Sequence, residues 1–207
     1  MGKKVVLFSG GKDSVYVALR EWPVDFFVTF VYEFPRPSPH LLNISKVLEL
    51  AGSMSVPMVV LKVHKGKEKE EEAELLSSLG ASEIIAGDQG VEDHLKYMEE
   101  LAKMAGAELK EPIWGLEPEK VLEDELRNMS FAIIGAEEKA KELLCKKVEE
   151  SSAEEFKSKL KELGVDPIGE AGEYHTLVTS VKKLGASVEF SCREIKKFEE
   201  YYIALLD

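Results

Sequence analysis

Strand-like and helix-like segments alternate along the first two thirds of the chain, and this alternation most limits the folds that the chain can adopt. Apolar runs typical of buried strands cover residues 5–8, 24–32, 57–61, 83–86 and 131–134, and helical spacing covers residues 13–20, 40–52, 65–79, 91–105 and 117–128. Strands separated by helices of about three turns pair in parallel, with helices on both faces of the sheet. The pattern therefore predicts an α/β fold with a five-stranded parallel sheet.

The pattern changes in the last third of the chain. A helix over residues 153–164 ends at Gly164, a residue type that commonly terminates helices. Strand-like segments follow over residues 177–181, 187–195 and 201–206, and consecutive strands of this kind favour antiparallel pairing. We therefore expect a smaller C-terminal α+β part, with a boundary near residue 143 that divides the chain into residues 1–142 and 143–207.

The charge and the apolar runs exclude two classes of function. The 207 residues include 39 acidic and 27 basic residues, so the net charge is −12. An acidic surface repels a phosphate backbone, and direct nucleic-acid binding is therefore not expected. The sequence has no apolar run of about 18 residues, which excludes a membrane-spanning helix. The four apolar residues after Lys4 are too few for a signal peptide, so we expect a cytoplasmic protein.

The cysteines and the amide residues add two expectations. Cys145 and Cys192 are isolated, without a Cys-x-x-Cys pattern or a histidine at metal-binding spacing. We therefore expect two unreactive thiols in the core. The chain has one Gln and two Asn but is rich in Lys and Glu, a bias typical of hyperthermophilic proteins, so a thermophilic source is expected.

The hexapeptide Ser9-Gly10-Gly11-Lys12-Asp13-Ser14 lies between the first strand and the first helix. In an open parallel sheet, ligands bind at the carboxyl ends of the strands. Adjacent glycines let the backbone direct N–H groups toward an anion, and the start of a helix adds further N–H groups and a partial positive charge. The hexapeptide therefore predicts a phosphate site in which the Lys12 ammonium neutralises charge. Its pattern differs from that of the G-x-x-x-x-G-K-[ST] loop.

This hexapeptide resembles the pyrophosphate-binding loop of the N-type ATP pyrophosphatases, which cleave ATP to AMP and pyrophosphate on a five-stranded parallel sheet. The resemblance implies that ATP is bound by Ser9, Gly10, Gly11, Lys12, Asp13 and Ser14, and Gly87 after the fourth strand is assigned to the same site. It also implies Mg²⁺ as a cofactor, with Asp13 as the metal ligand.

Residues 169–176 form a second motif, Gly-Glu-Ala-Gly-Glu-Tyr-His-Thr, which we call the Glu motif. In a strand, Glu173 and His175 would point to the same face, because Tyr174 separates them. The pair could act on ammonia, a carboxylate or a metal. The alternative is a glycine-containing turn before an edge strand, with its charges in solvent.

Together, the hexapeptide and the Glu motif resemble the diphthine–ammonia ligase family, which amidates the carboxylate of diphthine on translation elongation factor 2. The resemblance extends over nearly the whole chain and includes the segment Pro112-Ile113-Trp114-Gly115. It implies catalytic roles for Asp13, Glu170, Glu173 and His175, and it places the acceptor substrate at His40, Asn43, Asp88, Trp114 and Thr176.

The chain departs from the family pattern at two places. The family usually carries E-G-G-E-[YF]-E-T, where this chain has Ala171 for a Gly and His175 for a Glu. A sister branch with His at this position is associated with corrinoid metabolism. The Tyr-Gln-Arg stretch typical of the family after the fourth strand is replaced in residues 87–94. Both departures fall at the expected acceptor site, so the acceptor stays open.

Three further residues keep more than one interpretation. Asp88 is either a metal or ribose ligand or the N-cap of the following helix. Trp114 either lines the substrate pocket or packs in the core. His94 is expected to be either a surface residue or one whose polar atoms are satisfied within the fold.

The sequence therefore predicts an ATP-dependent, AMP-forming ligase that adenylates a carboxylate and transfers ammonia to it, with Glu173 or His175 as the base that deprotonates ammonium. Elongation factor 2 is the expected acceptor, and a homodimer is left open. One alternative is a related ligase on another acceptor, and another is a tRNA-modifying thiolase, which needs catalytic cysteines and a basic surface. A further alternative is a non-catalytic ATP-binding protein, which has no need of the Glu motif.

Overall fold

The computed structural model describes residues 2–33 and 37–207, which fall into two compact units. The first unit comprises Met1–Ser9, Asp13–Pro35 and Ser55–Gly115, and the second comprises Gly10–Lys12, Arg36–Met54 and Leu116–Asp207. This division differs from the expected boundary near residue 143, because residues 37–54 and 116–142 pack with the C-terminal strands. The second unit accordingly takes in more of the chain than the small C-terminal part that we expected.

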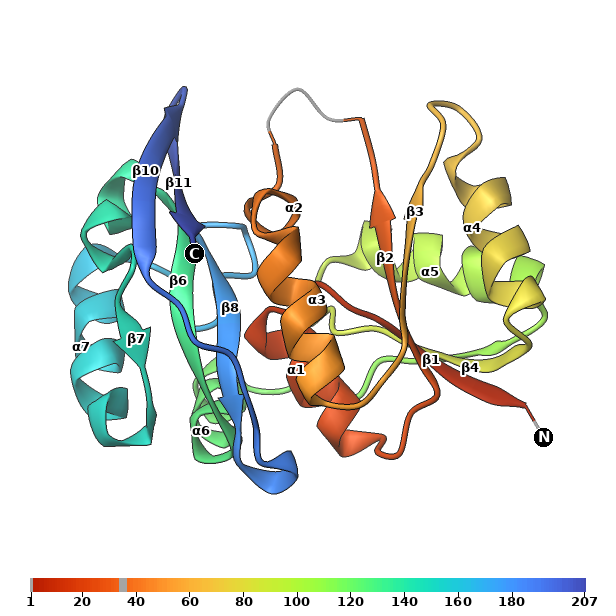
Figure 1. Cartoon of the computed structure of the whole chain (residues 1–207), viewed down its shortest axis with the longest axis horizontal. Coiled ribbons are helices and arrows are strands. Elements are labelled where there is room, and N and C mark those ends of the chain that lie inside the picture. Colours follow the sequence, from red (N-terminus) through yellow and green to blue (C-terminus); the bar gives the residue numbers. More distant parts are fainter. Residues whose placement is uncertain (1, 34–36) are drawn as a thin grey trace. The chain divides into compact units, whose positions relative to one another are not determined.

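A five-stranded parallel sheet forms the centre of the first unit (Figure 1). Its strands are β1 (Lys3–Leu7), β2 (Phe26–Val31), β3 (Met58–Lys62), β4 (Ala81–Ile85) and β5 (Glu108–Lys110). They lie in the order β3-β2-β1-β4-β5, and every pair is parallel, which confirms the predicted fold class.

The identity of the fifth strand corrects the sequence prediction. Strand β5 is only three residues long, partly exposed, and carries two charged residues, so it lacks the apolar run by which strands are found. The buried segment 131–134, which we expected as the fifth parallel strand, belongs instead to the second unit.

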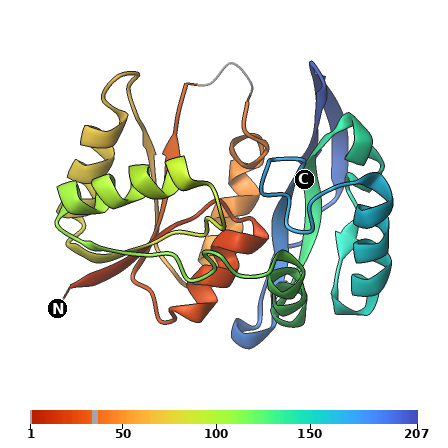
Figure 2. The ribbon, with the colours of Figure 1, turned by 180° about the vertical axis from the view of Figure 1, so that it is seen from behind.

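Three helices accompany the parallel sheet: α1 (Lys12–Arg20), α4 (Glu68–Ser78) and α5 (Glu92–Ala105). Strand β1 is central in the sheet, and the side chains of Val5 and Val6 are completely buried. On one face, Val5 and Ile84 pack in a single apolar cluster with Leu76 of α4 and Leu101 of α5. Figure 2 shows these two helices side by side.

An antiparallel sheet forms the centre of the second unit. Its strands are β6 (Met129–Glu137), β7 (Lys147–Val148), β8 (Tyr174–Val181), β9 (Ala186–Ser187), β10 (Cys192–Phe198) and β11 (Tyr201–Leu206). The strand order is β10-β11-β6-β8-β9, and β7 also pairs with β6. All these pairs are antiparallel, as the sequence predicts for the C-terminal strands.

Helices cover both faces of the antiparallel sheet. They are α2 (Pro39–Leu42), α3 (Ile44–Ser53), α6 (Pro118–Asn128) and α7 (Ala153–Leu163), with short 3-10 helices at Glu138–Leu143, Glu150–Ser152 and Lys182–Leu184. Figures 1 and 2 show α7 on one side of β6 and β8, and α2 and α3 on the other. Phe156 of α7 makes edge contacts with the rings of Phe131 and Tyr174, at centroid distances of 6.0 and 5.9 Å.

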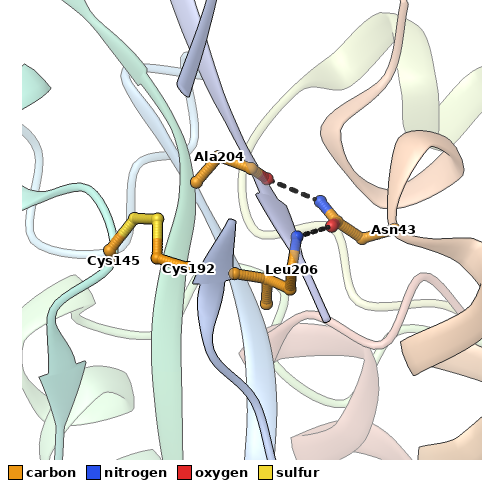
Figure 3. Close-up of a disulfide and its surroundings, with 5 residues drawn as sticks. All are labelled: Asn43, Cys145, Cys192, Ala204 and Leu206. Carbon is orange, nitrogen blue, oxygen red and sulfur yellow. Dashed lines mark hydrogen bonds between the residues drawn. A yellow bond between two sulfur atoms is a disulfide. The ribbon is translucent and has the colours of Figure 1, made fainter. Parts of the chain in front are cut away.

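Cys145 and Cys192 form a disulfide (Figure 3), so the expectation of two separate core thiols is wrong. Cys192 is exposed at the start of β10, and Cys145 is half-buried in the turn before β7. The two residues are 47 positions apart, and such a spacing carries no signal for pairing in the sequence.

None of the helices in residues 2–33 and 37–207 is long and apolar enough to span a membrane.

Candidate functional site

The strand order of the first unit reverses between β1 and β4, which are neighbours in the sheet. Strands β2 and β3 extend from one side of β1, and β5 extends from the far side of β4. In open α/β sheets, ligands bind outside the carboxyl ends of the strands at such a reversal. The two segments at this place are Ser9–Ser14, which we call the phosphate loop, and Gly87-Asp88 after β4.

The flanks of the phosphate loop belong to the first unit and approach the end of β4 closely. The Ser9 amide donates a hydrogen bond to Oγ of Ser14 at 3.3 Å, and the two hydroxyl oxygens are 3.2 Å apart. A Cβ atom on Gly87 would lie 3.2 Å from the carbonyl carbon of Asp13 and 3.4 Å from the nitrogen of Ser14. The glycine therefore lets the end of β4 lie against the first turn of α1.

Asp13 and Asp88 bring two carboxylates to this part of the first unit. Burial raises the pKa of the Asp88 carboxyl, and the negative charge of Asp13 raises it further. His94 lowers the pKa of Asp88, and its Nδ1 lies 3.7 Å from Oδ1 of that residue. The alternative role of Asp88 as a helix N-cap is wrong, because α5 begins at Glu92 with Val91 as its N-cap.

These two carboxylates suit a magnesium ion that is bound together with a nucleotide. Mg²⁺ is usually held by one or two carboxylates, several waters and the phosphate oxygens of the substrate. Within the described ranges, no group of three or more His, Cys, Asp or Glu residues could hold a metal ion without further ligands. Asp13 and Asp88 could therefore hold Mg²⁺ only with help from phosphate oxygens or water.

Trp114 belongs to a turn that is held beside Asp88 in the first unit. The amide of Gly115 donates a hydrogen bond to the carbonyl of Gln89 at 2.9 Å, and the amide of Trp114 donates to the carbonyl of Glu111. Gly115 has φ +68°, a conformation that favours glycine. The indole is half-buried, so it is not a core residue and has an exposed part for a ligand.

The middle of the phosphate loop, Gly10–Lys12, packs in the second unit against β8. The amide of Val178 donates to the carbonyl of Gly10 at 2.9 Å, and the amide of Lys12 donates to Oγ1 of Thr176 at 3.0 Å. Thr176, which the sequence analysis assigned to the acceptor, is buried and contacts the phosphate loop.

The side chain of Lys12 points into the second unit. Its Nζ lies 3.4 Å from Oε2 of Glu125 on α6 and 5.9 Å from the centre of the Tyr174 ring. The side chains of Lys12 and Glu125 are 1% and 0% exposed. The ammonium that we expected to neutralise a phosphate is therefore paired with a buried carboxylate.

The Glu motif begins in a turn that Asp166 organises. Oδ1 of Asp166 accepts hydrogen bonds from the amides of Ile168, Gly169 and Glu170 at 3.0, 2.9 and 3.4 Å. Gly169 has φ +70°, and a Cβ atom there would lie 2.9 Å from the Tyr174 ring. The turn therefore requires glycine at position 169. Glu170 follows directly at the end of this turn.

Glu173 and His175 make different contacts, although both lie near the start of β8. Oε1 of Glu173 accepts a hydrogen bond from the Asp166 amide at 3.3 Å and lies 3.7 Å from Nζ of Lys139. The ring of His175 lies 5.5 Å from that of His40 on α2 and 5.9 Å from that of Tyr201 on β11. The structure thus brings His40 and His175 together, and Tyr201 lies beside His175.

Asn43 has a structural role in the second unit (Figure 3). Its Nδ2 donates hydrogen bonds to the carbonyls of Pro39 and Ala204, each at 2.9 Å, and its Oδ1 accepts one from the amide of Leu206 at 2.8 Å. Asn43 is 1% exposed and both amide hydrogens are used. The residue therefore fixes the junction of α2 and α3 to β11.

His94 is exposed, as expected, but the sequence analysis missed its contact with Asp88 and the role of Glu125. His94 lies in the first turn of α5, six residues after Asp88, and this short separation was the available signal. On α6, the buried positions Val121, Leu122 and Leu126 share one face with Glu125. A charged residue on such a face needs a buried partner, but the sequence does not show which one.

Comparison with known proteins identifies the first half of the chain. Residues 2–109 match the family model of the diphthamide synthase N-terminal domain. No curated protein matches the chain. Among solved structures, the chain is similar to a predicted subunit of tRNA methyltransferase from Methanocaldococcus jannaschii, with 17% identity, coverage of 88% of this chain and 98% of that chain, and a TM-score of 0.47.

The family match includes the parts of the first unit on which the candidate site depends. The phosphate loop, Gly87 and Asp88 lie inside the matched residues, whereas Trp114 and the Glu motif lie outside them. Proteins with this type of loop bind ATP, typically together with Mg²⁺. Because the match covers more than half of the 207 residues, the chain belongs to the diphthamide synthase N-terminal domain family.

Proposed function

We propose that the protein is an ATP-dependent, AMP-forming amide ligase that adenylates a carboxylate and transfers ammonia to it. The observation that carries this proposal is the phosphate loop at the strand-order reversal of the parallel sheet, beside the carboxylates of Asp13 and Asp88. The family match to diphthamide synthase supports the same reaction class.

The proposed reaction has two steps. A carboxylate oxygen of the acceptor attacks the α-phosphorus of ATP, and the bond to the β-phosphate oxygen breaks with release of pyrophosphate. Ammonia then attacks the acyl carbon of the adenylate, and AMP leaves with the electron pair of the broken C–O bond. When bound, Mg²⁺ neutralises charge on the polyphosphate. The start of α1 and the serine hydroxyls of the loop stabilise the charge that develops on the leaving pyrophosphate.

Glu173 is the residue that we propose binds ammonium. Its Oε1 interacts with the Asp166 amide and with Lys139, but its Oε2 is buried without a hydrogen-bond partner in the described part of the chain. Buried carboxylate oxygens normally accept a hydrogen bond, and ammonium can donate four such bonds. We propose that Glu173 binds ammonium and takes its proton, with His175 beside the acceptor.

The proposed acceptor is the diphthine carboxylate of elongation factor 2. His175 stands where diphthine ligases usually carry Glu, so a corrinoid acid is the second candidate acceptor. The thiolase alternative has less support, because Cys145 and Cys192 are bonded to each other.

Incubation with ATP labelled in the adenine and in the γ-phosphate separates these reaction classes. The proposal expects AMP and pyrophosphate in equal amounts when ammonia and an acceptor carboxylate are both present, and pyrophosphate without free AMP when ammonia is left out. Diphthine-bearing elongation factor 2 and corrinoid acids are compared as acceptors in separate reactions. ADP as the product, or ATP binding without turnover on either acceptor, would contradict the ligase proposal.

A further inference from the structure

The phosphate loop occupies the edge of β8 as a short neighbouring strand would. Strand β9 pairs with only two residues of β8, Ser180 and Val181. Farther toward the start of β8, the amide of Val178 donates to the carbonyl of Gly10 at 2.9 Å. Gly10 has φ +79°, and a Cβ atom there would lie 3.1 Å from Val47 and 3.3 Å from Leu177. The backbone of the loop therefore rests tightly on this strand.

Thr176 holds the next part of the loop through its side chain. Its hydroxyl oxygen accepts a hydrogen bond from the amide of Lys12 at 3.0 Å, and the residue is 3% exposed. Lys12 is the first residue of α1, and the amides of a helix's first turn have no partner inside the helix. Thr176 supplies that partner for the Lys12 amide.

The side chain of Lys12 provides a second contact that holds this residue in place. Its ammonium lies 3.4 Å from the Glu125 carboxylate and 5.9 Å from the Tyr174 ring, in the interior of the second unit. Main chain and side chain of Lys12 are thus both held by residues that follow position 115 in the sequence. The loop's backbone conformation depends on β8 and α6 as well as on its own glycines.

We propose that Thr176 is a positioning residue for the nucleotide: its hydroxyl holds the Lys12 amide so that the phosphate loop keeps the shape that receives ATP. This inference rests on the proposed function, because it presumes that the loop binds ATP. It gives the last residue of the Glu motif a role in nucleotide binding, where the sequence analysis assigned it to the acceptor.

Strand β8 offers a matched control for this role. Thr179 is also buried, at 4% exposure, and its hydroxyl donates one hydrogen bond, to the carbonyl of Ser130 at 3.2 Å. Thr176→Val and Thr179→Val therefore each remove one buried hydroxyl from the same strand, but only the first removes a contact with the loop. Thr176→Ser keeps the hydroxyl oxygen and is the conservative rescue.

The experiment measures the ATP dissociation constant by calorimetry with Mg²⁺, and the melting temperature of each variant. We expect Thr176→Val to weaken ATP binding by about tenfold or more, because the Lys12 amide loses its acceptor. Thr176→Ser keeps this acceptor, and its ATP affinity should stay within about threefold of that of the unchanged protein. Thr179→Val should lower the melting temperature to a similar extent as Thr176→Val and leave ATP affinity unchanged. Should Thr176→Val not fold, Thr176→Ala, which introduces no new bulk, takes its place.

Two results would overturn the inference in distinguishable ways. If the unchanged protein binds ATP and Thr176→Val binds it equally well, Thr176 is only structural and the proposed function stands. If the unchanged protein binds no ATP, the proposed function fails, and the positioning role fails with it. Equal weakening of ATP binding by Thr176→Val and Thr179→Val would assign the effect to general destabilisation of β8.

Discussion

The Nζ atom of Lys12 lies 3.4 Å from Oε2 of Glu125, and both side chains are almost completely excluded from solvent. Burial of two charges is tolerated because each offsets the other. The position of Lys12 inside the hexapeptide predicts a different partner, a phosphate group of the ligand. The partner in the fold is a residue on α6 that the sequence marks only as a carboxylate on a buried helix face.

Removal of either member of this pair is expected to destabilise the protein strongly. Lys12→Met or Glu125→Leu alone should lower the free energy of unfolding by about 3–5 kcal/mol, because each leaves one buried charge without compensation. The double variant Lys12→Met/Glu125→Leu should lose much less. Denaturant unfolding of the four proteins measures the coupling. Lys157→Met is the control, because it breaks a more exposed ion pair with Glu123 at 2.8 Å and should cost less than about 1 kcal/mol. Single variants as stable as the unchanged protein would contradict the prediction.

The alternation of strands and helices was sufficient to predict the parallel sheet, because buried strands carry long apolar runs. It was insufficient for β5, whose three residues pair at the sheet edge with little apolar surface. The positions of the hexapeptide after β1 and of Gly87 after β4 could be predicted, because short local patterns mark them. The contacts of Lys12 with Glu125 and Thr176, and the Cys145–Cys192 disulfide, join residues far apart in the sequence, and no local pattern encodes them.

Asp13 and Asp88 are predicted to share the metal ion of the reaction. Asp13→Ala should abolish ATP turnover and cost at most about 2 kcal/mol of stability, the upper range for a residue at a helix start. Asp88→Asn should raise the Mg²⁺ concentration needed for half-maximal turnover. Titration of pyrophosphate release with Mg²⁺ measures both effects. Asp93→Asn is the matched control, because this side chain is 94% exposed on the same helix as His94.

The pH dependence of that Mg²⁺ requirement follows from the raised pKa of Asp88. Burial and the charge of Asp13 raise this pKa above its ordinary value of 3.8. Protons therefore compete with Mg²⁺ at a higher pH than they would at an ordinary carboxylate. The Mg²⁺ requirement of the unchanged protein should rise on acidification, and that of Asp88→Asn should change less. Parallel curves for the two proteins would remove Asp88 from the metal site.

Glu72 is predicted to destabilise the protein as the pH rises. Its buried side chain accepts a hydrogen bond from the Tyr97 hydroxyl at 3.0 Å, and desolvation raises its pKa above 4.5. The folded state thus holds the Glu72 proton more tightly than the unfolded state does. The resulting stability is present at low pH and is lost as the pH rises from about 4.5 through the pKa in the folded state.

Thermal unfolding of Glu72→Gln tests whether Glu72 lowers the stability of the protein as the pH rises. Relative to the unchanged protein, the variant should gain stability with rising pH across that window and hold the gain above it. Glu71→Gln is the control with the opposite sign. The backbone hydrogen bond from His64, above all, lowers the pKa of Glu71, so its contribution is present above about 4.5 and is lost on acidification. Identical pH profiles for Glu72→Gln and the unchanged protein would be incompatible with a raised pKa.

The disulfide is predicted to contribute substantially to stability. A bridge across 47 residues restricts the unfolded chain by about 4 kcal/mol in the chain-entropy description. Cys145→Ser/Cys192→Ser should therefore melt at a lower temperature than the oxidised protein. A reducing agent should lower the melting temperature of the unchanged protein and leave that of the double variant unaltered. A reductant effect of equal size on both proteins would show that it does not act through this bond.

The last prediction concerns His175, the residue at which the chain departs from the diphthamide ligase pattern. Its ring lies 5.5 Å from that of His40 and 5.9 Å from that of Tyr201, and Glu173 lies two residues before it. An imidazole ordinarily titrates between pH 6 and 7.5, and a carboxylate is ionised throughout that range. The rate of ammonia transfer should therefore rise with pH through this window, because a positively charged His175 would oppose the binding of ammonium at Glu173 and a neutral His175 would not.

Single-turnover amidation between pH 5.5 and 8.5 measures that profile, with acyl adenylate formation measured separately. His175→Glu should flatten the transfer profile and leave adenylate formation unchanged. Glu173→Gln should keep ATP binding and lose transfer, because its amide cannot take the ammonium proton. Improved amidation of diphthine by His175→Glu would indicate that the acceptor has changed in this branch of the family. A flat profile in the unchanged protein, together with full activity of His175→Ala, would make His175 a packing residue against Tyr201.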